Sequence, residues 1–344
     1  MHISEFDYEL PEDLIAQQPL EKRDASRMLV LDRKSQTWSD SVFSKFPEHL
    51  QANDVVVVNN SRVIPARLSG RRAETGGAVE IFLVREVEPR IWEALVRPGG
   101  RLREGARVVF GDEELIGTLL DEPGHELRRV RFECEGRFED VVAELGSTPL
   151  PPYIKRPSGG SANDRERYQT IYSKSPGAIA APTAGLHFTD DVLEQVRARA
   201  FVAEVTLHVG YGTFEPVRVE DVDQHSVSSE RFTISDEAAE TINRSRANGG
   251  RVIVVGTTTM RALESAATDD GRVGATSGEA SLTIKPGYRF RIADTLLTNF
   301  HLPRSSLLVL VSAFAGRELV LRAYRHAVNE RYRFYSYGDC MLIL

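Results

Sequence analysis

Residues 176–214 read PGAIAAPTAGLHFTDDVLEQVRARAFVAEVTLHVGYGTF, and the rest of the chain is organised around this stretch. A helix is expected after Thr189, which is a good N-cap and is followed by two acids. Residues 202–209 then read as a strand. His187 and His208 lie among small residues, which let a ligand approach the backbone closely. The helix after His187 would aim free N–H groups toward the same place, so we expect the floor of a ligand site here.

Two runs of β-branched residues extend this pattern. Val55–Val58 is an uninterrupted valine run, which suits a strand covered on both faces. It ends in Asn59, Asn60 and Arg62, and polar residues at that position form ligand sites in open α/β sheets, although a plain turn fits the sequence equally well. Val252–Val255 is a second such strand, followed by a glycine, three threonines and a helix. The sequence therefore predicts an α/β fold with a mostly parallel sheet covered by helices.

Further elements are predicted from caps and periodicity. They are a short helix over 11–18, a strand over Met28–Leu31, a helix over 236–247 capped by Ser235, a helix over Leu307–Phe314 capped by Ser305 or Ser306, an amphipathic helix over Glu318–Glu330, and a final strand in the tail.

The character of the chain changes between Ile64 and Glu144. Short apolar runs alternate there with glycine- and proline-containing turns, and no long helical period is present before about residue 139. We expect an inserted all-β, barrel-like domain with strands over Val79–Val84, Ile91–Val96, Arg107–Phe110, Leu115–Leu120 and Arg128–Phe132. The predicted organisation is a catalytic α/β domain in two parts, residues 1–63 and 149–344, around an inserted domain over 64–148.

The charge and the cysteines exclude several classes of protein. The formal net charge is -7, so no overall basic excess indicates nucleic-acid binding. Residues 285–333 nevertheless hold nine lysines and arginines against three acids, which fits either an anion-binding face or a solvated helix surface. Two cysteines are too few for a disulfide framework or a cysteine-based zinc site. With no signal-peptide pattern and no apolar run of membrane-spanning length, we expect a cytoplasmic protein.

Short catalytic motifs do not identify the chemistry. The chain has no Walker phosphate loop, no HExxH, no Cys-x-x-Cys and no Gly-x-Ser-x-Gly elbow, so a metal site is unsupported. What remains is a set of polar residues in turns after predicted strands. From these residues alone the sequence indicates an α/β enzyme with an anionic or nucleoside-like ligand.

Longer blocks carry a resemblance that these single residues do not. The chain resembles the bacterial S-adenosylmethionine:tRNA ribosyltransferase-isomerases, the epoxyqueuosine-forming enzymes, nearly from end to end. The blocks are NNSRVIPARL (59–68), PLPPYIKR (149–156), YQTIYSKSPGAIAAPTAGLHFT (168–189), LHVGYGTFEPV (207–217), VGTTTMRALES (255–265), TNFHLPRSSLLVLVSAFAG (298–316) and YRFYSYGDCMLI (332–343).

The resemblance implies a reaction without a metal. Such enzymes transfer the ribosyl part of S-adenosylmethionine onto 7-aminomethyl-7-deazaguanine at the wobble position of tRNAs with GUN anticodons, isomerise it to an epoxycyclopentane, and release adenine and methionine. The sulfonium acidifies the adjacent C5′ protons, so a general base can start the reaction. Within this resemblance we expect a monomer, and the basic region of residues 285–333 is the candidate for contacts with tRNA phosphates.

Candidate roles follow from the resemblance and from the turn settings. The catalytic candidates are His187 or His208 as the base at C5′, with Glu230 and Asp339 for the proton to adenine or for the ribose hydroxyls. The candidates for substrate binding are Asn59, Asn60, Arg62, Thr183, Gly185, Gly210, Gly212, Thr213, Thr257, Thr258, Arg261, Asn299, His301, Arg304 and Tyr337. Of these, Thr257 and Thr258, with Thr259 and Arg261, would hold the methionine carboxylate. Tyr335 and Tyr337 are candidates for stacking on a flipped base. Each of these residues also has a structural explanation, as a turn, a cap or a packed side chain.

The chain departs from the family pattern at one place. The family usually has Met-His-Ala/Ser-Glu where this chain reads Val-Ser-Ser-Glu over 227–230, so Ser228 replaces a histidine. A tRNA-binding member with lost or altered activity is therefore one alternative. A related enzyme that alkylates a different nucleoside is another.

Overall fold

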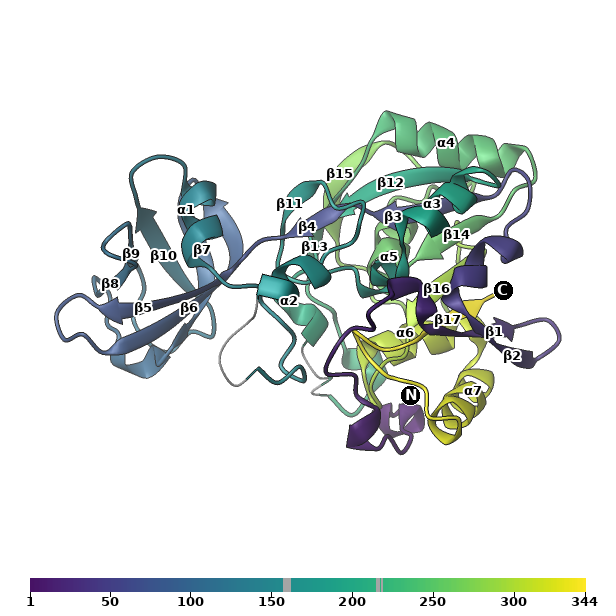
Figure 1. Ribbon diagram of the computed structural model, residues 1–344, viewed down its shortest axis with the longest axis horizontal. Helices are drawn as coiled ribbons and strands as arrows, with labels where there is room; N and C mark the ends of the chain where they lie inside the picture. Colours follow the sequence, from purple (N-terminus) through teal and green to yellow (C-terminus); the bar gives the residue numbers. More distant parts are fainter. Residues whose placement is uncertain (157–161, 215–216, 218) are drawn as a thin grey trace.

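The valine run forms strand β3 (Val55–Asn59) at the centre of a nine-stranded sheet (Figure 1). The computed structural model describes residues 1–156, 162–214, 217 and 219–344. All residues of β3 are buried. Val55 and Val57 pack into an apolar cluster on one face of the sheet, and Val56 and Val58 into a cluster on the other. The strand is therefore covered on both faces, as its sequence predicted.

The sheet is mixed, which corrects the expectation of a mostly parallel sheet. Its order is β15-β13-β12-β3-β14-β16-β17-β1-β2. The pairs β12–β3, β3–β14, β14–β16 and β17–β1 are parallel, whereas β15–β13, β13–β12, β16–β17 and β1–β2 are antiparallel. The outer antiparallel strands have a solvated face, as the alternating burial of β13 shows, whereas the antiparallel pair β16–β17 lies inside the sheet and is buried. The other bounds are β1 (Arg27–Asp32), β2 (Thr37–Val42), β12 (Phe201–Leu207), β13 (Glu230–Ile234), β14 (Val252–Val255), β15 (Thr276–Ala280), β16 (Thr295–Asn299) and β17 (Cys340–Ile343).

Helices cover both faces of this sheet. One cluster takes apolar side chains from α4 (Asp236–Ala247), α5 (Thr257–Ser265), α6 (Ser306–Ala315) and α7 (Arg317–Asn329). The other takes them from α3 (Asp190–Arg197) and the 3-10 helix η4 (Phe43–His49). The predicted caps are confirmed, because the side chains of Thr189, Ser235 and Ser305 accept bonds from the backbone N–H groups of Val192, Ala238 and Leu308.

The predicted helix over 11–18 is wrong. Only Glu12–Leu14 forms a 3-10 turn. The backbone beyond it bonds to the C-terminal tail instead: Ala16 N–H donates to Phe334 O, and Phe334 N–H donates to Leu14 O. These bonds between distant parts of the chain replace the bonds that a local helix would make.

The inserted β structure is a closed barrel, which Figure 1 shows at one end of the molecule. Its order is β10-β7-β6-β5-β8-β9, and its apolar core includes Phe138 and Val142 of α1 (Phe138–Leu145). The sequence missed β5, whose residues RLSGRR carry few apolar side chains. The barrel strands are β5 (Arg67–Arg72), β6 (Ala78–Glu88), β7 (Ile91–Arg97), β8 (Arg107–Phe110), β9 (Leu115–Leu119) and β10 (Arg128–Glu133).

The chain leaves the main sheet and returns to it through two paired segments. Strand β4 (Ser61–Val63) leads into the barrel and pairs in parallel with β11 (Ser175–Ala178), which follows the helix α2 (Ala162–Arg167). The limits of 64 and 148 for the inserted domain stay a prediction. In the part of the chain that the structure describes, no helix has both the length and the apolar character needed to span a membrane.

Candidate active site

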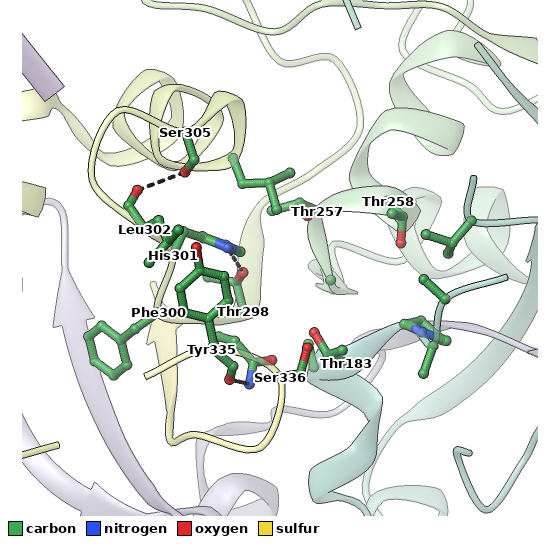
Figure 2. Close-up of a pocket in the computed structure, with 18 of the residues that line it drawn as sticks. Thr183, Thr257, Thr258, Thr298, Phe300, His301, Leu302, Ser305, Tyr335 and Ser336 are labelled. Carbon is green, nitrogen blue, oxygen red and sulfur yellow. Dashed lines mark hydrogen bonds between the residues drawn. The ribbon is translucent and has the colours of Figure 1, made fainter. Parts of the chain in front are cut away.

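A cavity of about 410 Å³ lies where β14 and β16 end (Figure 2). Ligand sites in open α/β sheets form at this edge, and the volume is in the range of small-molecule sites. Six predicted binding residues line it: Thr183, Thr257, Thr258, Asn299, His301 and Arg304. They come from three turns that lie far apart in the sequence. The structure therefore brings together the segments around 183, 257 and 301.

The N-terminus of α5 opens onto this cavity without a cap. Its N-cap residue is Gly256, which has a φ of +92° and no side chain to bond the first turn. Thr258 Oγ1 is buried and has no hydrogen-bond partner among the described residues. Free N–H groups at a helix N-terminus attract an anion, and the unpartnered hydroxyl adds a donor beside them. This end of the cavity is suited to a carboxylate.

The N-terminus of α6 faces the same cavity and is capped. Ser305 Oγ accepts a bond from Leu308 N–H at 3.2 Å and donates to Leu302 O at 2.8 Å, as Figure 2 shows for the second bond. Arg304 precedes it with a left-handed backbone, φ +57°, and its guanidinium pairs with Asp7 at 2.8 Å. Arg304 is the one arginine or lysine that lines the cavity among the described residues.

Tyrosines form another wall, which the sequence did not assign as a whole. The rings of Tyr153 and Tyr335 lie 3.9 Å apart between centroids, and Tyr153 OH bonds to Ser336 Oγ. Tyr168 contributes a buried hydroxyl with no partner among the described residues. Burial raises the pKa of all three phenols, so they are neutral donors at ordinary pH. Of these side chains only Tyr335 was singled out from the sequence. For Tyr153 the prolines that precede it in the sequence were the available signal.

His301 and His187 are both buried and neutral. Burial lowers the pKa of each imidazole to about 3. His301 lines the cavity, with Nε2 2.8 Å from Thr298 Oγ1. His187 lies behind the lining, where Nδ1 is 2.7 Å from Ser26 Oγ and Nε2 is 3.4 Å from Asn299 Nδ2. The helix α3 that follows His187 contributes no lining residue, contrary to the expected aim of its N–H groups.

His208 lies at the end of β12 against Gly177. A Cβ atom at Gly177 would approach His208 Nδ1 to 2.9 Å, so the glycine makes room for the ring. Nδ1 is buried and without a partner among the described residues. Burial, with the nearby Arg231, lowers the pKa of the imidazole. The next residue, Val209, lines the cavity, whereas His208 does not.

Glu230 and Arg261 form a buried ion pair rather than part of the cavity wall. Arg261 Nη1 donates to Glu230 Oε2 at 2.7 Å, and its other nitrogens donate to the carbonyls of Ser228, Ala280 and Leu282. Glu230 Oε1 accepts from Gly210 N–H. The pair lines a separate cavity of about 30 Å³ together with Gly212 and Ser228. Arg261 therefore lies outside the lining of the large cavity, where the sequence had placed it.

Asp339 is a buried backbone acceptor. Its side chain is 1% exposed and accepts from the backbone N–H groups of Arg27 and Arg333. Burial raises the pKa of the carboxyl above its usual value. Asp339 does not line the cavity, so its position supports a structural role.

The other candidate residues are distributed around the main sheet. Asn59 and Asn60 bond to the β12 segment, through Leu207 and through Glu204 and Thr206, and Arg62 is exposed on β4. Gly185 is packed against Tyr172 and Thr170. Tyr337 is buried beside Tyr168. Thr213 lies in the 3-10 helix Tyr211–Phe214, and its side chain is outside the described residues.

Most of the positive charges in the basic region of residues 285–333 are paired with carboxylates in the folded structure. Five of its nine cations pair with acids from elsewhere in the chain: Lys285 with Asp223, Arg291 with Asp269, Arg304 with Asp7, Arg317 with Glu5, and Arg331 with Asp13. Arg322 and Arg325 on α7 have no carboxylate partner among the described residues. Fewer unpaired cations therefore remain in this region than the sequence alone indicates. In the described residues, no group of three or more His, Cys, Asp and Glu side chains could hold a metal ion.

Comparison with known proteins identifies the family. A family model described as Queuosine biosynthesis protein matches residues 3–343. The chain belongs to the queuosine biosynthesis family. Two relatives in this family, from Symbiobacterium thermophilum and Desulfitobacterium hafniense, are each 50% identical over 345 residues and cover 100% of both chains. Both are named S-adenosylmethionine:tRNA ribosyltransferase-isomerase.

A solved structure extends the comparison within the queuosine biosynthesis family. The crystal structure of S-adenosylmethionine tRNA ribosyltransferase from Thermotoga maritima is 38% identical, with a TM-score of 0.57. The match covers 99% of this chain and 100% of that one. The α/β sheet with an inserted barrel is therefore a fold of this family.

Proposed function

We propose that the chain is an S-adenosylmethionine-dependent tRNA ribosyltransferase-isomerase. It transfers and isomerises the ribosyl moiety of S-adenosylmethionine onto 7-aminomethyl-7-deazaguanine at the tRNA wobble position, giving epoxyqueuosine with release of adenine and methionine. The observation that carries the proposal is the 50% identity, over the whole chain, to relatives that bear this name. The cavity supports it, because its polar groups suit a zwitterionic nucleoside rather than a phosphate.

The α5 terminus holds the methionine carboxylate in this proposal. The free N–H groups of the first turn and Thr258 Oγ1 supply donors at one side of the cavity. Neutral tyrosines line another side and offer ring faces that attract the sulfonium cation without a counter-ion. The half-buried Tyr335 provides the aromatic surface for the deazaguanine once the wobble nucleotide is splayed out of the anticodon loop.

We assign proton abstraction at C5′ to His208, which adjoins the lining residue Val209 and whose ring would have to turn toward the cavity to reach C5′. Its Nδ1 lacks a partner among the described residues, and the lowered pKa keeps the imidazole neutral and able to accept a proton. His208→Gln and His208→Ala should lower kcat at least about 100-fold, the usual contribution of a general base. Binding of S-adenosylmethionine should stay within about twofold. Rates within threefold of the unchanged protein would remove His208 from this role.

The finer features of the partner are also part of the proposal. The tRNA carries a GUN anticodon, and the enzyme acts in the cytoplasm, where such tRNAs are modified. A monomer is supported by the surface, since Met1, Val87 and Phe201 are the only exposed large apolar side chains among the described residues.

One incubation tests the reaction. The protein is mixed with S-adenosylmethionine and a GUN-anticodon tRNA bearing 7-aminomethyl-7-deazaguanine, and the nucleosides are analysed by mass spectrometry. Epoxyqueuosine and an equal amount of free adenine are expected. The same tRNA with unmodified guanine is the control and should give neither. Binding of both substrates without either product would instead favour a tRNA-binding member with lost activity.

A further inference from the structure

The side chain of Asn299 connects three parts of the site. It ends strand β16, is 2% exposed, and lines the cavity. Its Nδ2 donates to Tyr335 O at 3.0 Å. A carbonyl oxygen only accepts hydrogen bonds, so this contact fixes which end of the amide is nitrogen. The contact also secures the turn at Tyr335, whose φ is +73°.

The second contact of this amide fixes the tautomer of His187. His187 Nε2 lies 3.4 Å from the same Nδ2 atom, so Nε2 must be the acceptor. The proton of the neutral ring is then on Nδ1, which donates to Ser26 Oγ at 2.7 Å. Ser26 Oγ in turn donates to Arg23 O at 2.7 Å. Every donor in this chain of bonds has an acceptor, and the lone pair that a base would use is already occupied by Asn299.

The remaining polar atom of the group is Asn299 Oδ1. Both N–H groups of the amide are used, while Oδ1 is buried and has no partner among the described residues. A buried acceptor without a partner is unfavourable until a donor reaches it. S-adenosylmethionine carries such donors on its ribose, its adenine and its methionyl ammonium group.

We propose that Asn299 Oδ1 accepts a hydrogen bond from an N–H or O–H donor of S-adenosylmethionine, and that His187 is a positioning residue that orients this amide rather than the base at C5′. The proposal rests on the proposed function, because it takes S-adenosylmethionine as the occupant of the cavity. It differs from the first expectation for His187, which followed from the small residues around it.

Binding measurements test the role of Asn299. Asn299→Ala should weaken S-adenosylmethionine binding about tenfold, the usual effect of removing one hydrogen bond to a buried group. Asn243→Ala is the matched control, because Asn243 on α4 makes two similar bonds to Val273, away from the cavity. It should lower thermal stability without changing the affinity. Failure of the unchanged protein to bind S-adenosylmethionine would refute the proposed function itself, whereas equal affinity in the unchanged and Asn299→Ala proteins would overturn only the present inference.

Two ligands locate the donor. S-adenosylhomocysteine keeps the amino-acid part, and 5′-methylthioadenosine lacks it. Equal weakening of both by Asn299→Ala assigns the donor to the nucleoside, and weakening of the first alone assigns it to the ammonium group. Either outcome supports the inference, and no weakening of either ligand contradicts it.

A double-mutant cycle and a rescue test the role of His187. If both residues act through one amide, His187→Leu with Asn299→Ala should bind no more weakly than Asn299→Ala alone. His187→Gln keeps an acceptor for Asn299 but cannot act as a base, so it should retain kcat within about fivefold and the same pH profile as the unchanged protein. A His187→Gln protein with normal affinity, a kcat lowered 100-fold or more and a missing acid limb in its pH profile would show instead that His187 is the base.

Discussion

Thr258 and Arg261 lie one turn apart on α5, and both are 6% exposed, yet their polar groups differ completely. Arg261 bonds to Glu230 and to three backbone carbonyls. Thr258 Oγ1 has no partner among the described residues, and Thr258 lines the large cavity. One helix thus carries a group whose three nitrogens all donate hydrogen bonds, beside a hydroxyl group that has no partner among the described residues. The difference separates what stabilises the fold from what is free to bind.

The largest expected effect comes from breaking the buried ion pair between Arg261 and Glu230. Arg261→Met leaves the carboxylate of Glu230 buried without its cation, and we expect the free energy of unfolding to fall by about 3–5 kcal/mol. Denaturant unfolding measures it. Arg261→Met combined with Glu230→Leu removes both charges and should recover much of the loss. A loss of under about 1 kcal/mol for the single change would mean that the pair is not the stabilising unit described here.

The buried neutral His301 should make the stability of the protein depend on pH. The pKa of His301 is lowered to about 3 in the folded protein, against an ordinary value of 6.5. Between these values the unfolded chain binds the proton and the folded protein does not, so stability falls as the pH falls below 6.5. His301→Gln should reduce the slope of the unfolding free energy by about 1.4 kcal/mol per pH unit between pH 6 and 4. Above pH 7.5 the unfolding free energies of the two proteins should change with pH in the same way. Identical slopes for the two proteins between pH 6 and 4 would contradict a buried, neutral His301.

Removing the free hydroxyl should affect binding and spare stability. Thr258→Val replaces an unpartnered buried hydroxyl by a methyl group, so we expect the unfolding free energy to stay the same or rise by up to about 1 kcal/mol. S-adenosylmethionine binding should weaken about tenfold, and the preference over decarboxylated S-adenosylmethionine should shrink. Calorimetric titration with both ligands checks this. An unchanged preference would place the carboxylate away from α5.

The smallest effect extends the comparison to the surface. Arg322 and Arg325 lack carboxylate partners among the described residues, whereas Arg317 and Arg331 pair with Glu5 and Asp13. Changing Arg322 and Arg325 to glutamate should lower the slope of log tRNA affinity against log salt by about 0.7–0.9 for each phosphate that the protein no longer neutralises.

The double change of Arg317 and Arg331 to glutamine is the control for this surface. It should alter the slope less, since those charges are already neutralised by neighbouring carboxylates. Equal slopes for both double variants would move the tRNA-binding face to another part of the molecule.

Local signals predicted much of the fold. The valines of β3, the caps of α3, α4 and α6 and most barrel strands were readable because each depends on residues that are neighbours in the sequence. The failures depend on distant partners. The segment over 11–18 forms backbone hydrogen bonds with Phe334 instead of a helix. The polar segments β2 and β5 form strands because they pair with β1 and β6.

The site divides in the same way. Turns after predicted strands correctly indicated residues that line the cavity, among them Thr257, Asn299 and His301. The hydrogen-bond partners of those residues could not be predicted, because they are separated by long stretches of sequence. His187 looked like a base among small residues, and its contacts with Ser26 and Asn299 bring together parts of the chain more than 100 residues apart.

Strand β17 has a consequence for the order in which the molecule forms. It lies between β1 and β16, with Met28 opposite Cys340, so the strand that comes after all others in chain order occupies an interior position in the sheet. The six barrel strands, in contrast, all lie between Arg67 and Glu133 and are synthesised well before β17. Tyr335 and Ser336 stand just before β17 and line the cavity, so the cavity is complete only after this part of the chain has been synthesised. A chain released before residue 340 would therefore leave β1 and β16 without their shared neighbour, as unpaired edges that favour aggregation.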